Sequence, residues 1–490
     1  MRLFLQILLV KNLRIDYNTF DCCLFFWNDK STVIEGGIRM SNGSSAELLK
    51  KAREEARATK GYQRITALFD EGTFNEVDGL AKSGEGYAEV VAGYGLVDDC
   101  PVYAFAKNSD VAGGAMSKAQ AAKIKKVYDL AVKTGAPVVG IYDSIGGRLA
   151  EGADLLAAYG EILKDSAALS GVVPQISLVL GPCIGTSAMI AANADVIVLT
   201  EKAELTVSTG GENAGAAHAA ETGVCSILAK TEEEAFEAVK NVLANLPSNN
   251  LSGAPAAEVG VMGVPVAVES SEPYAVISSV SDPETFVELS AAFGKSAVTG
   301  LAQISGASVG LVAYQGVLDA DACSKAARFV RFCDAFSLPV VSFVDASEFA
   351  SLREAVKLSN AYAEATTAKI TVITGEAYGP VYIAVAGRGA NADYAMAWAN
   401  AVVSPIAPAA AALFLHSDEL KGSEHPVEDR KALIESYKKN EATPLAAAAQ
   451  GYIEDVILPE ETRDRVIANL AMLSSKRVSN LPKKHSNIQL

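Results

Sequence analysis

Two glycine-containing segments of the chain could bind an anion through backbone N–H groups. They are GPCIGT at residues 181–186 and GEAYGP at residues 375–380, and each follows an apolar run typical of a buried strand. A glycine-rich turn that opens a helix presents free N–H groups and the positive end of the helix dipole, which together can hold an oxyanion. The alternative is that these glycines only permit tight turns. We call the two segments the first corner and the second corner.

Other common catalytic arrangements are missing from the sequence. The G-x-S-x-G pattern occurs only as GASVG at residues 306–310, inside a β-rich segment and not before a helix, and there is no GxxxxGK[ST] loop. Neither a serine-hydrolase nucleophile nor a P-loop ATP site is therefore supported. The seven cysteines show no metal-ligand spacing, and we expect buried thiols in a reducing cytosol. The four histidines show no partner spacing and are expected to be structural or surface residues: His218, His416, His425 and His485. A mechanism built on histidine therefore has few candidates.

The composition is that of a packed, acidic globular protein. At roughly 100 to 200 residues per domain, 490 residues predict two to four domains. Lys plus Arg is 42 and Asp plus Glu is 58, which gives a formal net charge of −16. This charge argues against nucleic acid or an anionic membrane as a partner, and a polyanionic ligand would need a local basic patch.

The elements expected around the corners alternate between strands and helices, and their order occurs twice. Residues 117–134 and 153–168 have helical spacing, and PVVGIYDS and VPQISLVLG are expected strands, so the fold class is α/β with a mostly parallel sheet. GAPVVGIYDS recurs as SLPVVSFVDA, where Asp345 minus Asp143 gives 202, and Gly375 minus Gly181 gives 194. The chain is therefore expected to be an internal duplication, with a first domain over 40–255 and a second over 256–490.

The first 39 residues differ in composition from the rest. Large and charged residues follow the apolar stretch 3–10, which does not fit a signal peptide, and no apolar run is long enough to span a bilayer. At Met40 the sequence changes to a capped, strongly helical opening. We expect Met40 to be the natural start and residues 1–39 to lie outside the native protein. The alternative is a native extension that docks on a partner.

From about Arg64 to Leu490, the chain resembles the carboxyltransferase subunit of biotin-dependent acyl-CoA carboxylases and decarboxylases. The motifs that carry the resemblance are RITALFDEGTFNEVD, KTGAPVVGIYDSIGGRLAEGADLLAAYGEI, SGVVPQISLVLGPC, LPSNN, GVLDADACSKAARFVRFCDAF, LPVVSFVDA and the tail GYIEDVILPEETRDRVIANLAMLSSKRV. The resemblance implies two tandem crotonase (ClpP-like) fold domains. It also implies transfer of a carboxyl group between biotin and a short acyl-CoA, in which biotin supplies the base that the chain lacks.

The resemblance places two oxyanion holes on the corners. The first, for the acyl-CoA enolate, falls on Gly185 and Thr186, and the second, for the biotin ureido oxygen, falls after Gly379 on Pro380 and Val381. Thr186 keeps a backbone N–H, but proline has none, so one donor of the second pair is missing. The second half departs further from the family pattern after Asp345, where a glycine-rich loop is replaced by the expected helix SLREAVKLSN.

Coenzyme A binding is expected on the first half. The candidates are Arg148 with Gly146 and Gly147, the glycine pair Gly113 and Gly114, and the lysines Lys118, Lys123, Lys125 and Lys126. For the lysines, the alternative is that they lie on a solvent-exposed helix face, which is the commoner reason for such a series of lysines.

The family resemblance also implies partners. The chain carries neither a biotin attachment site nor an ATP-grasp signature, so a separate biotin carboxyl carrier protein is expected. A biotin carboxylase, or a membrane decarboxylase subunit that exports sodium, would complete the system. Family members form hexamers, as trimers of dimers, with each site between two subunits. Two alternatives stay open: a crotonase-type hydratase or isomerase using Glu212 or Glu221, and a non-catalytic scaffold.

Overall fold

The computed structural model describes residues 45–83, 86–208, 213–256 and 266–488. Residues 55–490 form one compact unit, and Met1–Glu54 form another. Of the latter, the described part is the start of helix α1 (Ser45–Arg57), which has no buried residue. The extension expected over residues 1–39 lies outside the described residues. The domain limits expected at 39/40 and 255/256 stay predictions.

The first half is built on a mixed sheet with the strand order β1-β4-β5-β6-β7-β8-β10, and β9 pairs with β7. The first three strands are antiparallel, and the strands from β5 to β10 run parallel. Their bounds are β1 (Asn75–Glu76), β4 (Val90–Val97), β5 (Cys100–Lys107), β6 (Val138–Ser144), β7 (Gln175–Ile184), β8 (Val196–Thr200), β9 (Glu204–Thr206) and β10 (Ile227–Ala229). A small hairpin, β2 (Lys82–Ser83) and β3 (Gly86–Tyr87), lies outside this sheet.

The second half repeats this topology. Its strand order is β11-β12-β13-β14-β15-β16-β18, and β17 pairs with β15 just as β9 pairs with β7. The bounds are β11 (Val287–Leu289), β12 (Ala297–Ile304), β13 (Ala307–Leu318), β14 (Val340–Phe349), β15 (Lys369–Tyr378), β16 (Tyr394–Trp398), β17 (Val402–Ser404) and β18 (Asp455–Ile457). The equivalent strand orders confirm the predicted duplication and the α/β class.

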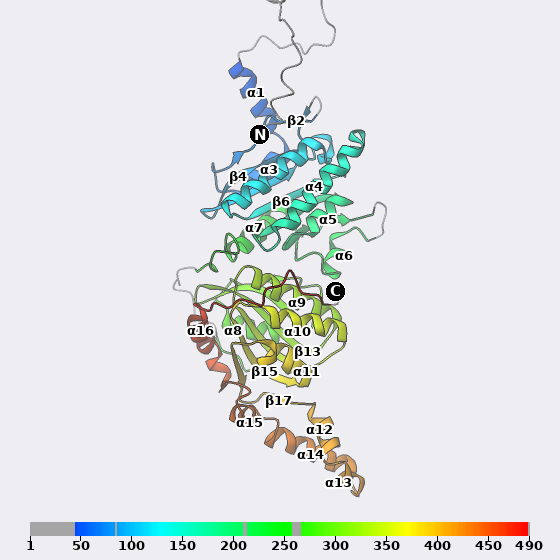
Figure 1. The fold of residues 1–490 in the computed structure, drawn as a ribbon, viewed down its shortest axis with the longest axis vertical. Coiled ribbons are helices and arrows are strands. Elements are labelled where there is room, and N and C mark those ends of the chain that lie inside the picture. Colours follow the sequence, from blue (N-terminus) through cyan, green and yellow to red (C-terminus); the bar gives the residue numbers. More distant parts are fainter. Residues whose placement is uncertain (1–44, 84–85, 209–212, 257–265, 489–490) are drawn as a thin grey trace, which may run out of the picture. The chain divides into compact units, whose positions relative to one another are not determined.

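Helices cover the sheets in pairs (Figure 1). Helices α3 (Lys118–Thr134) and α4 (Ala153–Leu169) cross one face of the first sheet, where Ile124, Val127 and Ile162 are buried with Phe105 and Val179. Helices α2 (Lys60–Leu68) and α7 (Glu232–Ala244) pack on its other face. In the second half, α9 (Ala320–Ala335) and α10 (Leu352–Glu364) lie together on the sheet, and the remaining helices include α8 (Pro273–Val280) and α16 (Thr462–Leu473). The helix expected at SLREAVKLSN is therefore confirmed as part of α10.

Local capping explains why the long helices begin and end where the sequence predicts. The Ser117 hydroxyl accepts a hydrogen bond from the Gln120 N–H (3.0 Å) at the start of α3, and Gly135 ends this helix with φ 66°. Asp319 caps α9 through the Ala322 N–H at 2.7 Å. A serine or aspartate before an apolar helical pattern and a glycine after it are local signals, so these bounds follow from sequence.

The glycines that begin the corners are not in turns, which corrects the sequence expectation. Strand β7 continues through Gly181 to Ile184, and β15 continues through Gly375 to Tyr378. An added Cβ at Gly181 would overlap the Asp143 carboxylate, and one at Gly375 would overlap Asp345. Each strand pair also shifts register there, between Tyr142 and Ser144 and between Val344 and Ala346. These glycines therefore make room for a carboxylate where the register of two parallel strands shifts.

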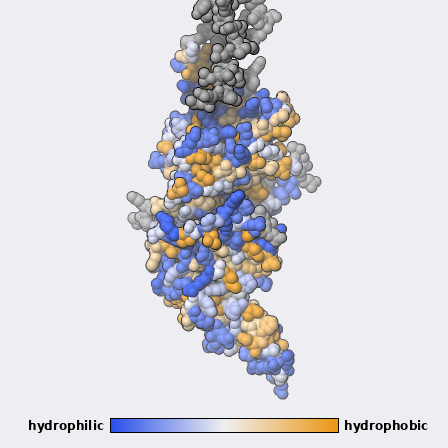
Figure 2. All heavy atoms as spheres, viewed as in Figure 1, coloured by the Kyte–Doolittle hydropathy of each residue, from blue (hydrophilic) through white to orange (hydrophobic). Residues whose placement is uncertain are grey.

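The C-terminal part carries an exposed apolar surface. It contains α12 (Pro408–Leu415), α13 (Ser417–Lys421), α14 (Pro426–Asn440) and α15 (Pro444–Ala449). Figure 2 shows hydrophobic residues gathered in the region of α12 and α14, and the exposed ones are Leu413, Phe414, Leu415 and Val427. Side chains of this size gathered on one surface are typical of a contact with another protein.

No described helix is both long and apolar enough to cross a bilayer. Among the described cysteines, Cys183, Cys225, Cys323 and Cys333 are buried as expected, whereas Cys100 is exposed. Cys100 begins a strand directly after the turn at Asp98 and Asp99, which explains its exposure.

The contact between each corner glycine and its aspartate gives a stability prediction. Gly375→Ala should displace Asp345 from its hydrogen bonds with Glu376 N–H and the Ser271 hydroxyl and should lower stability by about 1–3 kcal/mol. Gly160→Ala is the control, because Gly160 lies exposed inside α4 with no atom within 4 Å of the added Cβ. It should gain about 0.5–1 kcal/mol. Chemical denaturation measures both, and equal midpoints would contradict the assignment.

Candidate functional site

The first corner lies where β7 ends and the seven-residue helix α5 (Thr186–Ala192) begins. Gly185 joins them with φ 66° and ψ −133°, and no atom lies within 4 Å of a Cβ placed on it. Thr186 is partly exposed, and its N–H takes no part in a hydrogen bond among the described residues. The space around Gly185 is therefore open, and a ligand can approach the Thr186 N–H there.

The other donor expected at this corner is already used, which corrects the prediction. The Gly185 N–H donates to the Thr206 carbonyl oxygen at 2.8 Å, because β9 pairs alongside the end of β7. Gly185 therefore supplies the backbone conformation of the corner and leaves Thr186 as the available donor of the pair. The sequence could not show this bond, since it depends on a strand 20 residues further along the chain.

Hydrogen bonds join the two other glycine segments beside this corner. Gly113 and Gly114 have φ 62° and 65°, and their carbonyls accept bonds from the Ile145 N–H (3.1 Å) and the Ser144 hydroxyl (2.7 Å). Ser144 is in turn the register partner of Cys183. The structure thus brings together the segments around 113–114, 144–147 and 183–186. The Gly147 N–H is a further donor with no partner among the described residues.

Arg148 is held inside the chain through one guanidinium nitrogen, and its expected role in binding CoA stays a prediction. Its Nη1 donates to Glu89 Oε1 at 2.8 Å and also contacts the Ser83 hydroxyl, and Glu89 is fully buried. The second Glu89 oxygen accepts from the Ser117 hydroxyl at 2.5 Å. Arg148 therefore neutralises a buried carboxylate that anchors the start of α3. Glu89 lies 59 residues before Arg148 in the chain, so no local pattern pointed to this pair.

The lysines of α3 favour the interpretation as a helix face. Lys118, Lys125 and Lys126 lie at the surface, each within 4 Å of a carboxylate: Asp154, Glu161 and Asp78 respectively. Lys123 is only 3% exposed and donates to the Val90 carbonyl at 2.9 Å, so it is excluded as a surface ligand for CoA.

A buried lysine that the sequence analysis missed lies behind the first corner. Lys107 ends β5, and its Nζ donates to the Ser187 hydroxyl at 2.8 Å, one residue after Thr186. Lys107 is 1% exposed, and its burial lowers the pKa to about 8. The same burial raises the pKa of the neighbouring Cys183 thiol to about 12. A charged residue at the end of the apolar run VYAFA was the available sequence signal.

The second corner differs from the first. Gly379 has φ 39° and is buried, and an added Cβ would lie 2.8 Å from the Pro405 carbonyl oxygen. Pro380 is exposed and Val381 is fully buried. The helix α11 (Gly379–Val381) is a single turn that leads into the π-helical turn η4 (Tyr382–Ala386), so a strong helix dipole, as expected from sequence, does not form. The Val381 N–H is the donor that remains of the expected pair.

The residues considered for a hydratase or isomerase, for histidine chemistry or for metal binding do not form a second site among the described residues. Glu221 ends helix α6 (Ala216–Glu221) with an exposed side chain, and Glu212 lies outside the described residues. His416 contacts Glu419 at 3.0 Å, and His485 contacts the Ser486 carbonyl. No group of three potential metal ligands occurs in the described ranges.

Comparisons with known proteins identify the family. Residues 53–488 match the family model of the carboxyl transferase domain, and the chain belongs to this family. It is 37% identical over 483 residues to the carboxyltransferase subunit of propionyl-CoA carboxylase from Haloferax mediterranei, covering 87% of this chain and 93% of that one. It is 35% identical over 505 residues to the alpha subunit of methylmalonyl-CoA decarboxylase from Veillonella parvula, covering 92% and 97%.

The solved structure of transcarboxylase 12S gives the fold. It is 30% identical, with a TM-score of 0.86 over 92% of this chain and 100% of that chain, and it holds methylmalonyl-CoA and methylmalonic acid in a hexamer assembly. This match confirms the predicted pair of tandem crotonase (ClpP-like) domains.

The buried ion pair of Arg148 gives a prediction that separates a structural from a ligand-binding role. Arg148→Met should leave Glu89 buried without its cation and lower stability by about 2–4 kcal/mol, somewhat below a fully buried pair, because Arg148 is 33% exposed. Arg388→Met is the matched control at a pair with Glu454, where Arg388 is 68% exposed, and should cost less than about 1 kcal/mol. Urea denaturation and CoA titration check both. A weaker affinity for CoA at unchanged stability would contradict the structural role.

Proposed function

We propose that the chain is a carboxyltransferase that moves a carboxyl group between biotin on a separate carrier protein and a short acyl-CoA. The observation that carries this proposal is the first corner, where an open glycine with positive φ precedes the Thr186 N–H, which has no partner among the described residues. An enolate oxygen needs such a fixed donor, and catalysis depends on how firmly the surroundings hold it. Relatives that act on propionyl-CoA and methylmalonyl-CoA support the same class of substrate.

The chain's own residues supply orientation and anion stabilisation. Thr186 N–H donates to the thioester oxygen, and Gly147 N–H is the second candidate donor in the adjoining segment. Gly146 has φ 126° and no atom within 4 Å of an added Cβ, so a ligand can approach the backbone closely there. A negative charge that develops on the oxygen is then stabilised by dipoles already in place, without reorganisation.

The second corner fits the ureido group of biotin only in part. Val381 has a backbone N–H but is fully buried, Pro380 has no N–H, and Gly379 is closed on one side by Pro405. When bound, biotin would carry the carboxyl group and exchange the α-proton with the acyl-CoA. Because one expected donor is missing, we derive no step through this corner. If the second corner cannot bind biotin at all, the chain would bind CoA without transferring a carboxyl group. This is the scaffold alternative.

The assembly proposed for the chain is a homohexamer with a separate biotin carboxyl carrier protein. The related transcarboxylase 12S is a hexamer, and the exposed apolar side chains of α12 and α14 offer a surface for contact between subunits. The further partner is a biotin carboxylase or a membrane decarboxylase subunit. The chain is similar both to a subunit of a carboxylase and to a subunit of a decarboxylase. We propose that the chain acts in the cytoplasm, with any membrane association through such a partner.

The role of Thr186 can be tested by removing only its N–H. Proline is well tolerated as the first residue of a helix, and Thr186 is the first residue of α5. Thr186→Pro should lower the rate of carboxyl exchange between methylmalonyl-CoA and free biotin by about 10²- to 10³-fold. Thr186→Ala keeps the N–H and should stay close to the unmodified rate. If both variants exchange equally well, Thr186 N–H is not the donor.

The second corner predicts a gain of activity. Pro380→Ala would restore an N–H and should raise carboxyl transfer to biotin by about 10-fold or more, while leaving acyl-CoA affinity unchanged. Pro408→Ala is the matched control, because Pro408 also opens a helix but lies outside the corner. Initial rates with radiolabelled carboxyl donor measure the effect. An unchanged rate for Pro380→Ala would show that this position does not limit the reaction with biotin.

A further inference from the structure

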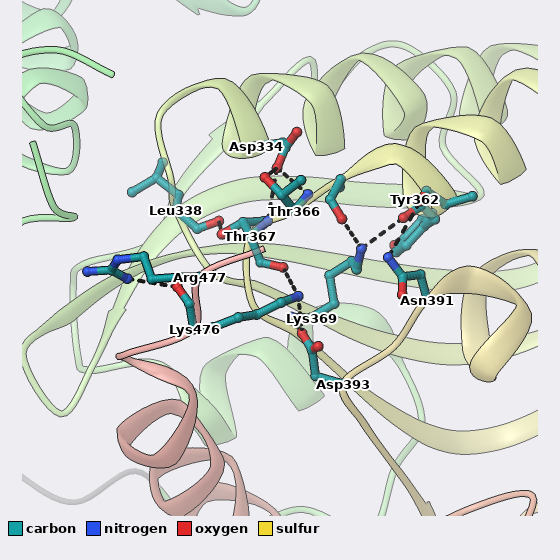
Figure 3. Close-up of polar contacts among 12 residues, drawn as sticks. Asp334, Leu338, Tyr362, Thr366, Thr367, Lys369, Asn391, Asp393, Lys476 and Arg477 are labelled. Atoms are coloured by element: carbon teal, nitrogen blue, oxygen red, sulfur yellow. Dashed lines mark hydrogen bonds and ion pairs between the residues drawn. The ribbon is translucent and has the colours of Figure 1, made fainter. Parts of the chain in front are cut away.

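Four lysines with buried side chains occur in the described part of the compact unit, and one differs from the others in its partner. Lys123 donates to the Val90 carbonyl and lies 3.5 Å from Glu76, and Lys325 donates to the Phe293 carbonyl at 3.0 Å. Lys369 donates to the carbonyls of Tyr362 and Ala365 at the end of α10, as Figure 3 shows. Lys107 has neither a carboxylate nor a carbonyl acceptor among the described residues, but only the Ser187 hydroxyl.

The surroundings of Lys107 do not compensate its charge. Its Nζ lies 5.8 Å from the centre of the Tyr142 ring, and the Tyr159 hydroxyl lies 3.4 Å from Ser187 Oγ. Taking an ammonium out of water without a counter-ion is costly, and an apolar residue of similar size would pack there without that cost. The charge therefore has no evident structural reason, in contrast to Lys369, which satisfies the carbonyls at a helix end.

The place of this charge connects it with the first corner. Ser187 follows Thr186 directly in the first turn of α5, so the hydroxyl that holds the ammonium and the N–H offered to the ligand belong to adjacent residues. In a water-poor interior, a positive charge acts over several ångströms with little screening. An anion at Thr186 N–H would be stabilised, whereas a neutral carbonyl would gain much less.

We propose that Lys107 is a positioning residue of the first corner, whose buried ammonium stabilises negative charge on the acyl-CoA oxygen held at the Thr186 N–H. This inference rests on the proposed function. Lys107 would strengthen binding of the enolate more than binding of the neutral thioester. This difference in affinity is what accelerates the reaction.

The charge state of Lys107 gives the proposal a second readout. Burial lowers the pKa of this lysine to about 8, so the ammonium is present below this pH and is lost above it. The titratable groups that face it are Tyr142 on β6, Cys183 on β7 and Tyr159 on α4, and burial raises the pKa of each, so they stay neutral around pH 8. Glu89, which precedes β4, is already paired with Arg148.

The experiment compares two CoA thioethers as ligands of the full chain. One carries a preformed nitronate, which resembles the enolate, and the other carries a neutral ketone. Lys107→Met should weaken binding of the nitronate by about 10- to 100-fold, less than the loss of a direct donor because the ammonium acts from behind Ser187. Binding of the ketone should change less than about twofold. Methionine fits the buried site without a charge, so the variant is expected to fold.

Lys369→Met is the matched control, since it removes an equally buried ammonium from the other half. It should leave both affinities unchanged even if it lowers stability. In carboxyl exchange, the unmodified chain should lose activity as the pH rises through about 8, and Lys107→Met should lack this decline at a lower overall rate. Equal losses for both ligands in Lys107→Met, or an unaltered pH profile, would overturn the proposal. If the unmodified chain binds neither ligand, it is the proposed function that fails.

Discussion

In each half of the chain, an aspartate packs against a glycine near the end of two parallel strands, and this contact shapes the sheet before each corner. Asp143 lies against Gly181 in the first half and Asp345 against Gly375 in the second, and in both places the strand register shifts. Each carboxylate is held by hydrogen bonds, from Arg64 and the Ser109 hydroxyl in one half and from Ser271 and Glu376 in the other. Because the residue opposite each aspartate is a glycine, the carboxylate fits against the strand, and β7 and β15 continue in the sheet as far as the corners.

The two halves use this shared scaffold differently. In the first half, Gly185 is open, Thr186 keeps an available N–H, and a buried ammonium lies behind the corner. In the second half, Gly379 is closed by Pro405 and Pro380 has no N–H. The buried Lys369 lies at the start of β15, at the opposite end from the corner, where it binds helix carbonyls. The duplication thus produced two similar folds, of which the first is better suited to holding an anion. This asymmetry agrees with a chain whose halves receive different ligands.

Much of the fold could be predicted from the sequence because its signals are local or repeated. The caps at Ser117 and Gly135 fix α3, and the aspartates 202 residues apart indicate the duplication. The site was harder to predict, because its details come from contacts between distant segments. The bond from Gly185 to Thr206, the ion pair of Arg148 with Glu89 and the placement of Lys107 behind Ser187 all require the folded sheet. From residue type alone, the Gly185 N–H and the Arg148 guanidinium were expected to be free for a ligand. Tertiary contacts already use this N–H and one nitrogen of Arg148.

In the proposed mechanism, the first corner polarises an acyl-CoA carbonyl without an acid or base from the described residues. Isotope-edited infrared spectroscopy of bound propionyl-CoA, labelled with ¹³C at the thioester carbonyl, tests this claim most directly, because the stretching frequency reports hydrogen bonding to that oxygen. We expect a band at clearly lower frequency than for the same thioester in water. A band at the solution frequency, or at that of a carbonyl in an apolar solvent, would contradict it.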